Sequence, residues 1–150
     1  MMANIQQEEA LKDLLIGRWT QASRKVAELA EVIPADEFES RPLSGVRSCG
    51  EVLRHVAFWN QYVADTLNGK EADDVGNELP VATYSTKASV LEVLKSSSED
   101  VATALGEHRA PFDLKATELI MTFIEHMAEH YGQLVAYTRL MGVTPPTSRT

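Results

Sequence analysis

The chain has 150 residues, of which 44% are hydrophobic and 24% are charged, and its formal net charge is −8. This length and composition are typical of one globular domain, over residues 1–150, with a substantial hydrophobic core. Phosphate groups are bound by clustered Lys and Arg, so the acidic charge and the lack of a basic run argue against nucleic acids and anionic membranes as partners. The single cysteine, Cys49, excludes an internal disulfide and a cysteine-based zinc site.

The N-terminal segment, residues 1–15, is acidic and lacks the apolar core of a signal peptide. No stretch of the chain approaches the roughly 18 consecutive apolar residues that a membrane span requires. We therefore expect a cytoplasmic protein without a membrane-spanning segment.

The first predicted element is a helix over residues 6–32, where apolar side chains recur at three- and four-residue spacing. Pro34 ends this helix, because proline cannot continue the hydrogen-bond ladder. Residues 34–46 contain two prolines and a glycine and predict a loop.

A second helix is predicted to begin at Ser48, since Ser48 and Glu51 have the spacing of a capping box. It ends at Asn68-Gly69, in the manner of a left-handed C-cap. The residues expected on its inward face are Val52, His55, Val56, Trp59, Tyr62, Val63 and Thr66.

Residues 70–84 are polar and predict an extended connection to a third helix over residues 86–107. Three serines, 96–98, are weak helix formers in the middle of that helix, and we expect a local distortion there. A fourth helix is predicted over residues 115–141, where Gly142 and two following prolines end it.

Four amphipathic helices without any strand-like alternation predict an all-α four-helix bundle. The connection between the second and third helices has about 17 residues and could span ~55 Å when extended. A helix of about 20 residues is only ~30 Å long, so these two helices can run parallel. We expect an up-down-down-up arrangement, with a simple up-and-down bundle as the alternative.

Two of the four histidines, His126 and His130, lie four residues apart on one face of the predicted fourth helix. Both imidazoles can therefore reach a single metal ion. Their row on the helix is apolar at its ends and polar in its middle, and consists of Leu119, Phe123, His126, His130, Gln133 and Tyr137. Buried imidazoles need polar partners, which a metal ion or a water-filled cavity supplies. The alternative is a solvated helix face without metal.

His55, on the inward face of the second helix, is the candidate third ligand. Three neutral imidazoles suit zinc, nickel, copper or iron and leave coordination positions open for water or substrate. Structural zinc sites, by contrast, are usually closed by four protein ligands. The histidine set therefore indicates a site of the catalytic type.

Two other metal motifs do not fit the chain. Residues 126–130 match the H-x-x-E-H pattern of inverzincin proteases, but those need an acidic ligand far downstream, and only 20 residues follow His130. Glu129 also projects away from the histidine row. Di-iron bundles use Glu-x-x-His pairs, whereas Phe123 and Met127 stand three residues before the two histidines.

Residues 49–57 (CGEVLRHVA) and 124–146 (IEHMAEHYGQLVAYTRLMGVTPP) resemble the DinB/YfiT-like superfamily of metal-binding proteins. Trp19 and Arg41-Pro42 also fit, so the resemblance covers nearly the whole chain. It implies an up-down-down-up bundle, often dimeric, with one divalent metal, typically nickel or zinc, on three histidines. Carried over by position, the ligands are His55, His126 and His130.

Relatives with assigned chemistry include transferases of low-molecular-weight thiols, bacillithiol or mycothiol, and a mycothiol-dependent isomerase. The resemblance therefore implies a metal-dependent enzyme, either a thiol S-transferase or a hydrolase, that acts on small electrophilic molecules, and a homodimer. The first alternative function is that of a non-catalytic metal- or ligand-binding stress-response protein. The second alternative is a metal-free helical interaction module. Metal identity, substrate and dimer surface stay open at this point.

Several other residues have two interpretations. Gln133 either orients bound water or substrate, or hydrogen-bonds a neighbouring helix. Glu51 is either a cap or an acid–base group, and Cys49, at a helix N-terminus, is either a thiol of lowered pKa or a passive small residue. The acidic 70–84 connection is either a solvated loop or a lid. Four aromatic side chains either line a substrate pocket or belong to the core, namely Trp59, Tyr62, Phe123 and Tyr137.

Overall fold

The computed structural model describes residues 2–108 and 113–148. These residues form four helices and one short 3-10 helix, and no strand occurs among them, which confirms the predicted all-α class. The elements are α1 (Met2–Val32), α2 (Cys49–Leu67), α3 (Lys87–Glu107), α4 (Leu114–Leu140) and η1 (Pro146–Ser148). Within the described part of the chain, no helix is long and apolar enough to cross a membrane.

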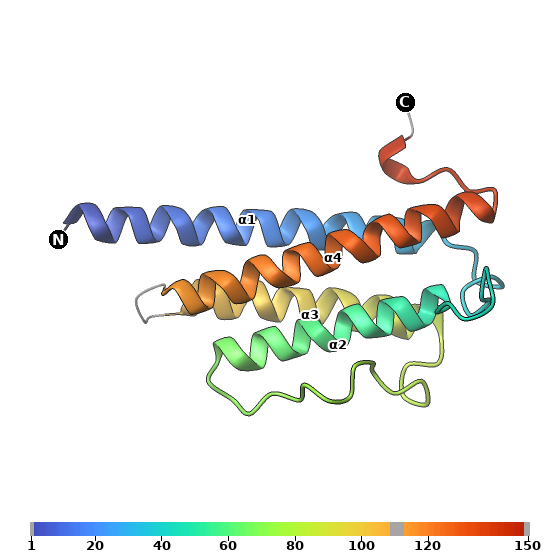
Figure 1. The fold of residues 1–150 in the computed structure, drawn as a ribbon, viewed down its shortest axis with the longest axis horizontal. Coiled ribbons are helices and arrows are strands. Elements are labelled where there is room, and N and C mark those ends of the chain that lie inside the picture. The colour runs from blue at the N-terminus through green and yellow to red at the C-terminus, as the bar shows by residue number, and fades with distance from the viewer. Residues whose placement is uncertain (1, 109–112, 149–150) are drawn as a thin grey trace.

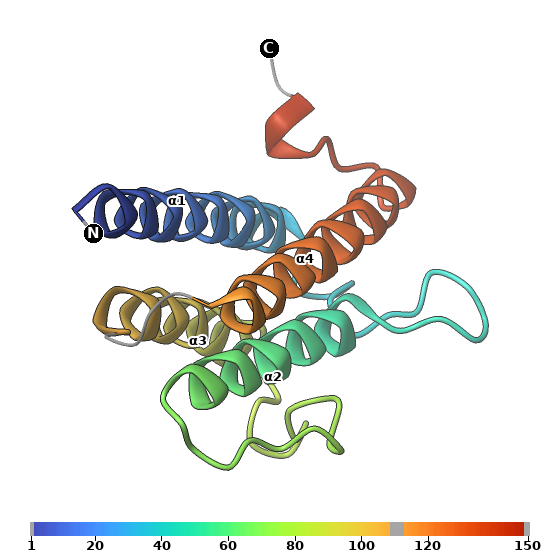
Figure 2. The same ribbon diagram turned by 60° about the vertical axis from the view of Figure 1, so that its left-hand side comes forward.

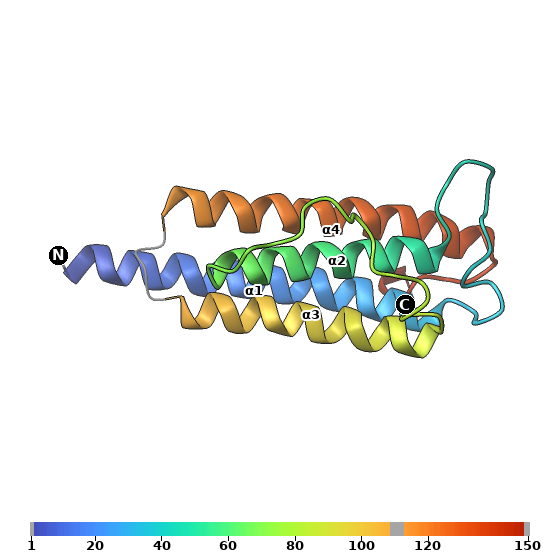
Figure 3. The ribbon, with the colours of Figure 1, turned by 90° about the horizontal axis from the view of Figure 1, so that it is seen from below.

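The four helices lie side by side as a bundle in which α1 and α4 run in one direction and α2 and α3 in the other (Figure 1). Each of α1 and α2 packs against both α3 and α4. The α2–α3 connection travels back along the bundle to reach the start of α3 (Figure 3). The α1–α2 loop extends beyond one end of the bundle (Figure 2). The two histidine-bearing helices, α2 and α4, are therefore antiparallel neighbours.

The start of α2 is set by the predicted capping box. The Ser48 hydroxyl accepts a hydrogen bond from the Glu51 backbone N–H, at 3.1 Å, and the Glu51 carboxylate accepts one from the Ser48 N–H, at 2.7 Å. These bonds satisfy two N–H groups that a helix start leaves without partners. The predicted end also agrees, because Asn68 is the C-cap and Gly69 has a φ of 68°, which side chains disfavour.

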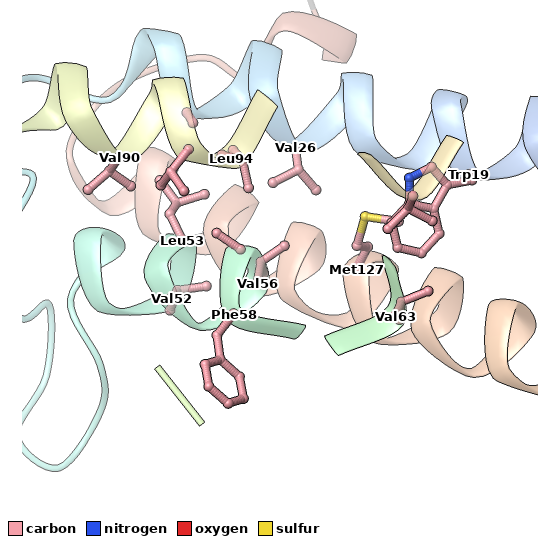
Figure 4. Packing of buried hydrophobic residues seen from close by; sticks show 14 of the residues in the cluster. Trp19, Val26, Val52, Leu53, Val56, Phe58, Val63, Val90, Leu94 and Met127 are labelled. Carbon is pink, nitrogen blue, oxygen red and sulfur yellow. The ribbon is translucent and has the colours of Figure 1, made fainter. Parts of the chain in front are cut away.

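The hydrophobic core lies where all four helices face one another, and Figure 4 shows Trp19, Val26, Val56 and Met127 pointing into it. Trp19 is fully buried, and its indole N–H donates to the carbonyl and the hydroxyl oxygen of Ser98, both at 3.1 Å. These contacts satisfy the indole nitrogen, which is the only polar atom of the Trp19 side chain.

The predicted distortion at residues 96–98 is wrong, because α3 is continuous from Lys87 to Glu107. The serines do not interrupt the helix, because Ser97 and Ser98 are buried and their hydroxyls have hydrogen-bond partners. Ser97 accepts a hydrogen bond from Asn60 of α2 and donates to the Leu94 carbonyl. Their small side chains also leave room for α1 and α2 to pack closely on α3, which outweighs a low intrinsic helix propensity.

A buried arginine joins three segments of the chain. The Arg54 side chain is only 1% exposed, yet it donates to both carboxylate oxygens of Glu39, at 2.6 and 3.1 Å, and to Glu78 at 3.1 Å. It also donates to the Tyr84 carbonyl at 3.3 Å. The hydrogen bond from Arg54 lowers the pKa of Glu39. A single guanidinium thus ties α2 to the α1–α2 loop and to the α2–α3 connection.

Replacing Arg54 with methionine should lower the free energy of unfolding by about 1–3 kcal/mol, because the hydrogen bonds to Glu39, Glu78 and the Tyr84 carbonyl are lost while both carboxylates stay partly hydrated. Urea unfolding of the metal-free protein measures this change. The matched control is Lys95→Met, which breaks an ion pair to Glu31 in which both side chains are 54% exposed. That pair contributes less than about 1 kcal/mol. Equal losses in the two variants would contradict the prediction.

Candidate metal centre

The structure brings together the three histidines that the sequence singled out. His55 lies on α2 and is 5% exposed, while His126 and His130 lie one turn apart on α4 and are partly buried. The antiparallel contact between α2 and α4 is what brings residues 71 positions apart in the sequence into one cluster. Within the described residues, this is the group of histidine, cysteine and carboxylate side chains whose geometry could hold a metal ion.

The donor atoms have the spacing that one ion requires. His126 Nε2 lies 2.9 Å from His55 Nε2 and 3.1 Å from His130 Nε2, and the donor atoms of all three lie within 4.8 Å of one another. Metal–nitrogen bonds of about 2.0–2.1 Å at tetrahedral or octahedral angles place neighbouring nitrogens roughly 2.8–3.4 Å apart. The two separations that involve His126 lie within this range, so the cluster is compatible with one bound ion.

The electrostatics of the site favour the neutral form of two of the three rings, His55 and His126. Burial lowers the pKa of His55 to about 4, and burial together with the neighbouring His130 and His55 lowers the pKa of His126 to about 3. Neutral imidazole is the form that binds a metal ion, so neither ring has to lose a charging proton before metal binds near neutral pH. His55 and His126 are therefore uncharged near neutral pH and do not repel a metal cation.

Hydrogen bonds outside the cluster orient two of the three rings. His55 Nδ1 lies 2.6 Å from the Asn77 carbonyl oxygen, and His130 Nδ1 lies 2.9 Å from the Gln133 side-chain oxygen. Both oxygens can only accept, so both Nδ1 atoms carry the proton and both Nε2 atoms turn lone pairs toward the centre. His126 Nε2 is then the donor between them, and its proton sits where a metal ion would bind.

Gln133 therefore acts within α4. Its amide nitrogen donates to the Tyr137 hydroxyl at 2.8 Å while its oxygen accepts from His130. These contacts do not support the alternative in which Gln133 hydrogen-bonds a neighbouring helix. Tyr137, 7% exposed, belongs to the core and also anchors this chain of hydrogen bonds.

Three aromatic side chains form a wall beside the histidines. Trp59 and Phe123 stack with ring centroids 5.4 Å apart, and Tyr62 lies 5.2 Å from Trp59 and 5.6 Å from Phe123. The Phe123 ring lies 5.7 Å from the ring of His126. All three are partly exposed, so the wall, unlike Tyr137, faces both the site and solvent.

The remaining candidates do not contribute to the site. Cys49 is fully buried, and burial, aided by Glu39, raises its thiol pKa to about 11, which makes it the passive small residue of the two interpretations. Glu51 serves the cap and pairs with Arg41. Glu129 is exposed, in agreement with its projection away from the histidine row.

Sequence reasoning missed Asn77 and the Glu39–Arg54–Glu78 ion pairs. A Gly76-Asn77 pair is a turn signal, and an arginine inside an otherwise apolar helix calls for buried partners. Neither signal identifies the segment that each residue contacts. The contacts join residues 15 to 24 positions apart, and loops bring these residues together.

Acidification should destabilise the metal-free protein from about pH 6.5 down to about pH 3. The unfolded chain keeps a histidine pKa of about 6.5, whereas in the folded state those of His55 and His126 are about 4 and about 3. The unfolded state therefore binds protons first as pH falls, which favours unfolding. Urea midpoints near pH 7 and pH 5 should differ less in His126→Gln than in the parent chain or in His108→Gln. An unchanged difference in His126→Gln would contradict this assignment.

Comparison with known proteins agrees with the geometry. Residues 18–134, more than half of the chain, match the family model of the DinB superfamily, and this segment contains all three clustered histidines. No curated protein matches the chain. The resemblance noted from the sequence is thus confirmed, and the chain belongs to the DinB superfamily.

Proposed function

We propose that this protein is a divalent-metal-dependent enzyme that adds a low-molecular-weight thiol, or water, to a small electrophilic molecule. The observation that carries the proposal is the cluster of His55, His126 and His130, whose donor nitrogens lie within 4.8 Å of one another without a fourth protein donor among the described residues. Three protein ligands leave room on the ion for a reacting group, as in catalytic zinc sites.

The donor set fits the metal that the family implies. Imidazole nitrogen suits zinc and nickel, and three Nε2 lone pairs would meet one ion once the His126 proton moves from Nε2 to Nδ1. We infer nickel or zinc as the resident ion. When bound, such an ion supplies Lewis acidity, which lowers the pKa of a thiol or of water so that a nucleophile is available near neutral pH.

The protein's own groups then position and shield the reactants. Asn77 and Gln133 hold two ligand rings in the tautomer that turns Nε2 toward the centre. The wall of Trp59, Tyr62 and Phe123 offers partly exposed apolar surface beside the histidines. An apolar part of the electrophile would pack there, which keeps the reacting carbon near the ion and excludes water.

A non-catalytic metal- or ligand-binding stress-response protein is the second candidate. It is favoured by the surroundings of the cluster. The rings contact amide groups and aromatic rings, and among the described residues no carboxylate that could act as a general base contacts them. The enzyme proposal needs no carboxylate base, because a bound ion would itself lower the pKa of the thiol or water. The expected homodimer and cytoplasmic location belong to the same proposal, and light scattering of the purified protein tests the dimer.

Protein purified without an affinity tag should contain about one nickel or zinc ion per chain. Because each imidazole supplies a ligand, His126→Ala and His130→Ala should lose most of this metal in elemental analysis. The control is His108→Ala, which removes the fourth histidine, at the C-terminal end of α3 and outside the cluster. Full metal content in His126→Ala would contradict the ligand set, and a metal-free parent protein would favour the interaction module.

Thiol consumption should depend on the ion if the protein is an enzyme. We expect a panel of thiols and electrophiles to reveal turnover that chelation abolishes and that added nickel or zinc restores. His55→Ala should reduce this turnover at least about 100-fold, since losing an interaction that orients or activates the nucleophile costs several kcal/mol. Full turnover after metal removal would contradict the proposal. Consistent inactivity with tight, saturable ligand binding would favour the non-catalytic candidate.

A further inference from the structure

The α2–α3 connection lies directly on the helix that carries His55. Figures 1 and 3 show this segment passing alongside α2. Asp73 first turns the chain by accepting hydrogen bonds from the backbone of Val75, at 2.9 Å, and of Gly76, at 3.1 Å. The Leu79 N–H then donates to the Arg54 carbonyl at 3.4 Å, one residue before the histidine. The connection is therefore attached to α2 by backbone as well as side-chain bonds.

Gly76 allows this close approach. A Cβ atom at this position would lie 2.8 Å from Cε2 of Phe58, closer than packed carbon atoms tolerate. Phe58 is the labelled core residue in Figure 4 that points away from the others. On the other side of the contact, Glu78 is fixed by its ion pair to buried Arg54. The residue between these two anchors is Asn77.

Asn77 makes two hydrogen bonds to α2, one from its backbone and one from its side chain. Its carbonyl oxygen accepts from His55 Nδ1 at 2.6 Å, and its Oδ1 accepts from the Trp59 indole N–H at 3.1 Å. Its φ is 61°, and it is the one non-glycine residue with positive φ in the described part of the chain. Asparagine is among the few side chains that tolerate this left-handed conformation.

We propose that Asn77 is a positioning residue for the metal centre. Its left-handed backbone aims the carbonyl at His55, which fixes the proton on Nδ1 and turns the Nε2 lone pair toward His126 and His130. Its side chain holds Trp59, so one residue sets both a ligand ring and the aromatic wall. This inference rests on the proposed function in taking His55 as a ligand, and partners of this kind typically change metal affinity about 10- to 100-fold.

The left-handed conformation makes the proposal testable by substitution. Asn77→Val disfavours positive φ and removes Oδ1, so the carbonyl should leave His55. Asn77→Gly keeps the backbone free to adopt positive φ and removes only the bond to Trp59. Asn77→Asp keeps both the tolerance of positive φ and an oxygen acceptor. Should Asn77→Val not fold, Asn77→Ala has the same backbone preference without the branched side chain.

The first measurement is the tautomer of His55 in metal-free protein, read from long-range ¹H–¹⁵N correlations. We expect the Nδ1–H form in the parent chain, in Asn77→Gly and in Asn77→Asp, and a mixture of tautomers in Asn77→Val. A mere loss of stability would not move this signal. An unchanged tautomer in Asn77→Val would overturn the proposal.

The second measurement is zinc affinity by competition with a chromophoric chelator. We expect about 10- to 100-fold weaker binding in Asn77→Val, and affinities within about threefold of the parent chain in the glycine and aspartate variants. Equal weakening in Asn77→Val and Asn77→Gly would overturn the role of the carbonyl. If the tautomer changes as expected but the parent chain binds no metal, the orienting of His55 stands and the proposed function fails.

Discussion

The imidazoles of His55, His126 and His130 share the contact between α2 and α4, and their need for polar partners governs the arrangement around them. An imidazole taken from water without a hydrogen bond costs a few kcal/mol, so each ring must be satisfied where it lies. The Asn77 carbonyl and the Gln133 side chain each satisfy one Nδ1–H, and the Nε2 atoms satisfy one another. This pairing lowers the free-energy cost of burying the rings and leaves the Nε2 lone pairs of His55 and His130 directed toward His126.

This arrangement requires the α2–α3 connection to be held in a fixed position on α2. The α2–α3 connection reaches His55 only because it is held on both sides of Asn77, by the close contact of Gly76 with Phe58 and by the Glu78–Arg54 ion pair. Arg54 in turn needs Glu39 from the α1–α2 loop, since a buried guanidinium with one partly exposed carboxylate would be poorly compensated. The histidine cluster, the α2–α3 connection and the α1–α2 loop are therefore coupled through two adjacent residues of α2, Arg54 and His55.

Much of this architecture follows from local sequence patterns. The capping box at Ser48, the left-handed Gly69 and the histidine pair on α4 depend on spacing within one helix turn, where rules of propensity and geometry hold without knowledge of the fold. The serines of α3 were misjudged because their surroundings, Trp19 and Asn60, belong to other helices. Propensity alone could not show that packing and hydrogen bonds would support a continuous helix there.

By itself the sequence determined the all-α class, the helix boundaries to within a few residues and the identity of the three clustered histidines. These depend on periodicity and on the scarcity of histidine in the chain. Only the tertiary structure decided which nitrogen of each ring faces the centre, that Arg54 is satisfied by two loops, and that Asn77 reaches His55. Those contacts join segments that are distant in sequence, and their geometry depends on how the bundle packs and where its connections lie on it.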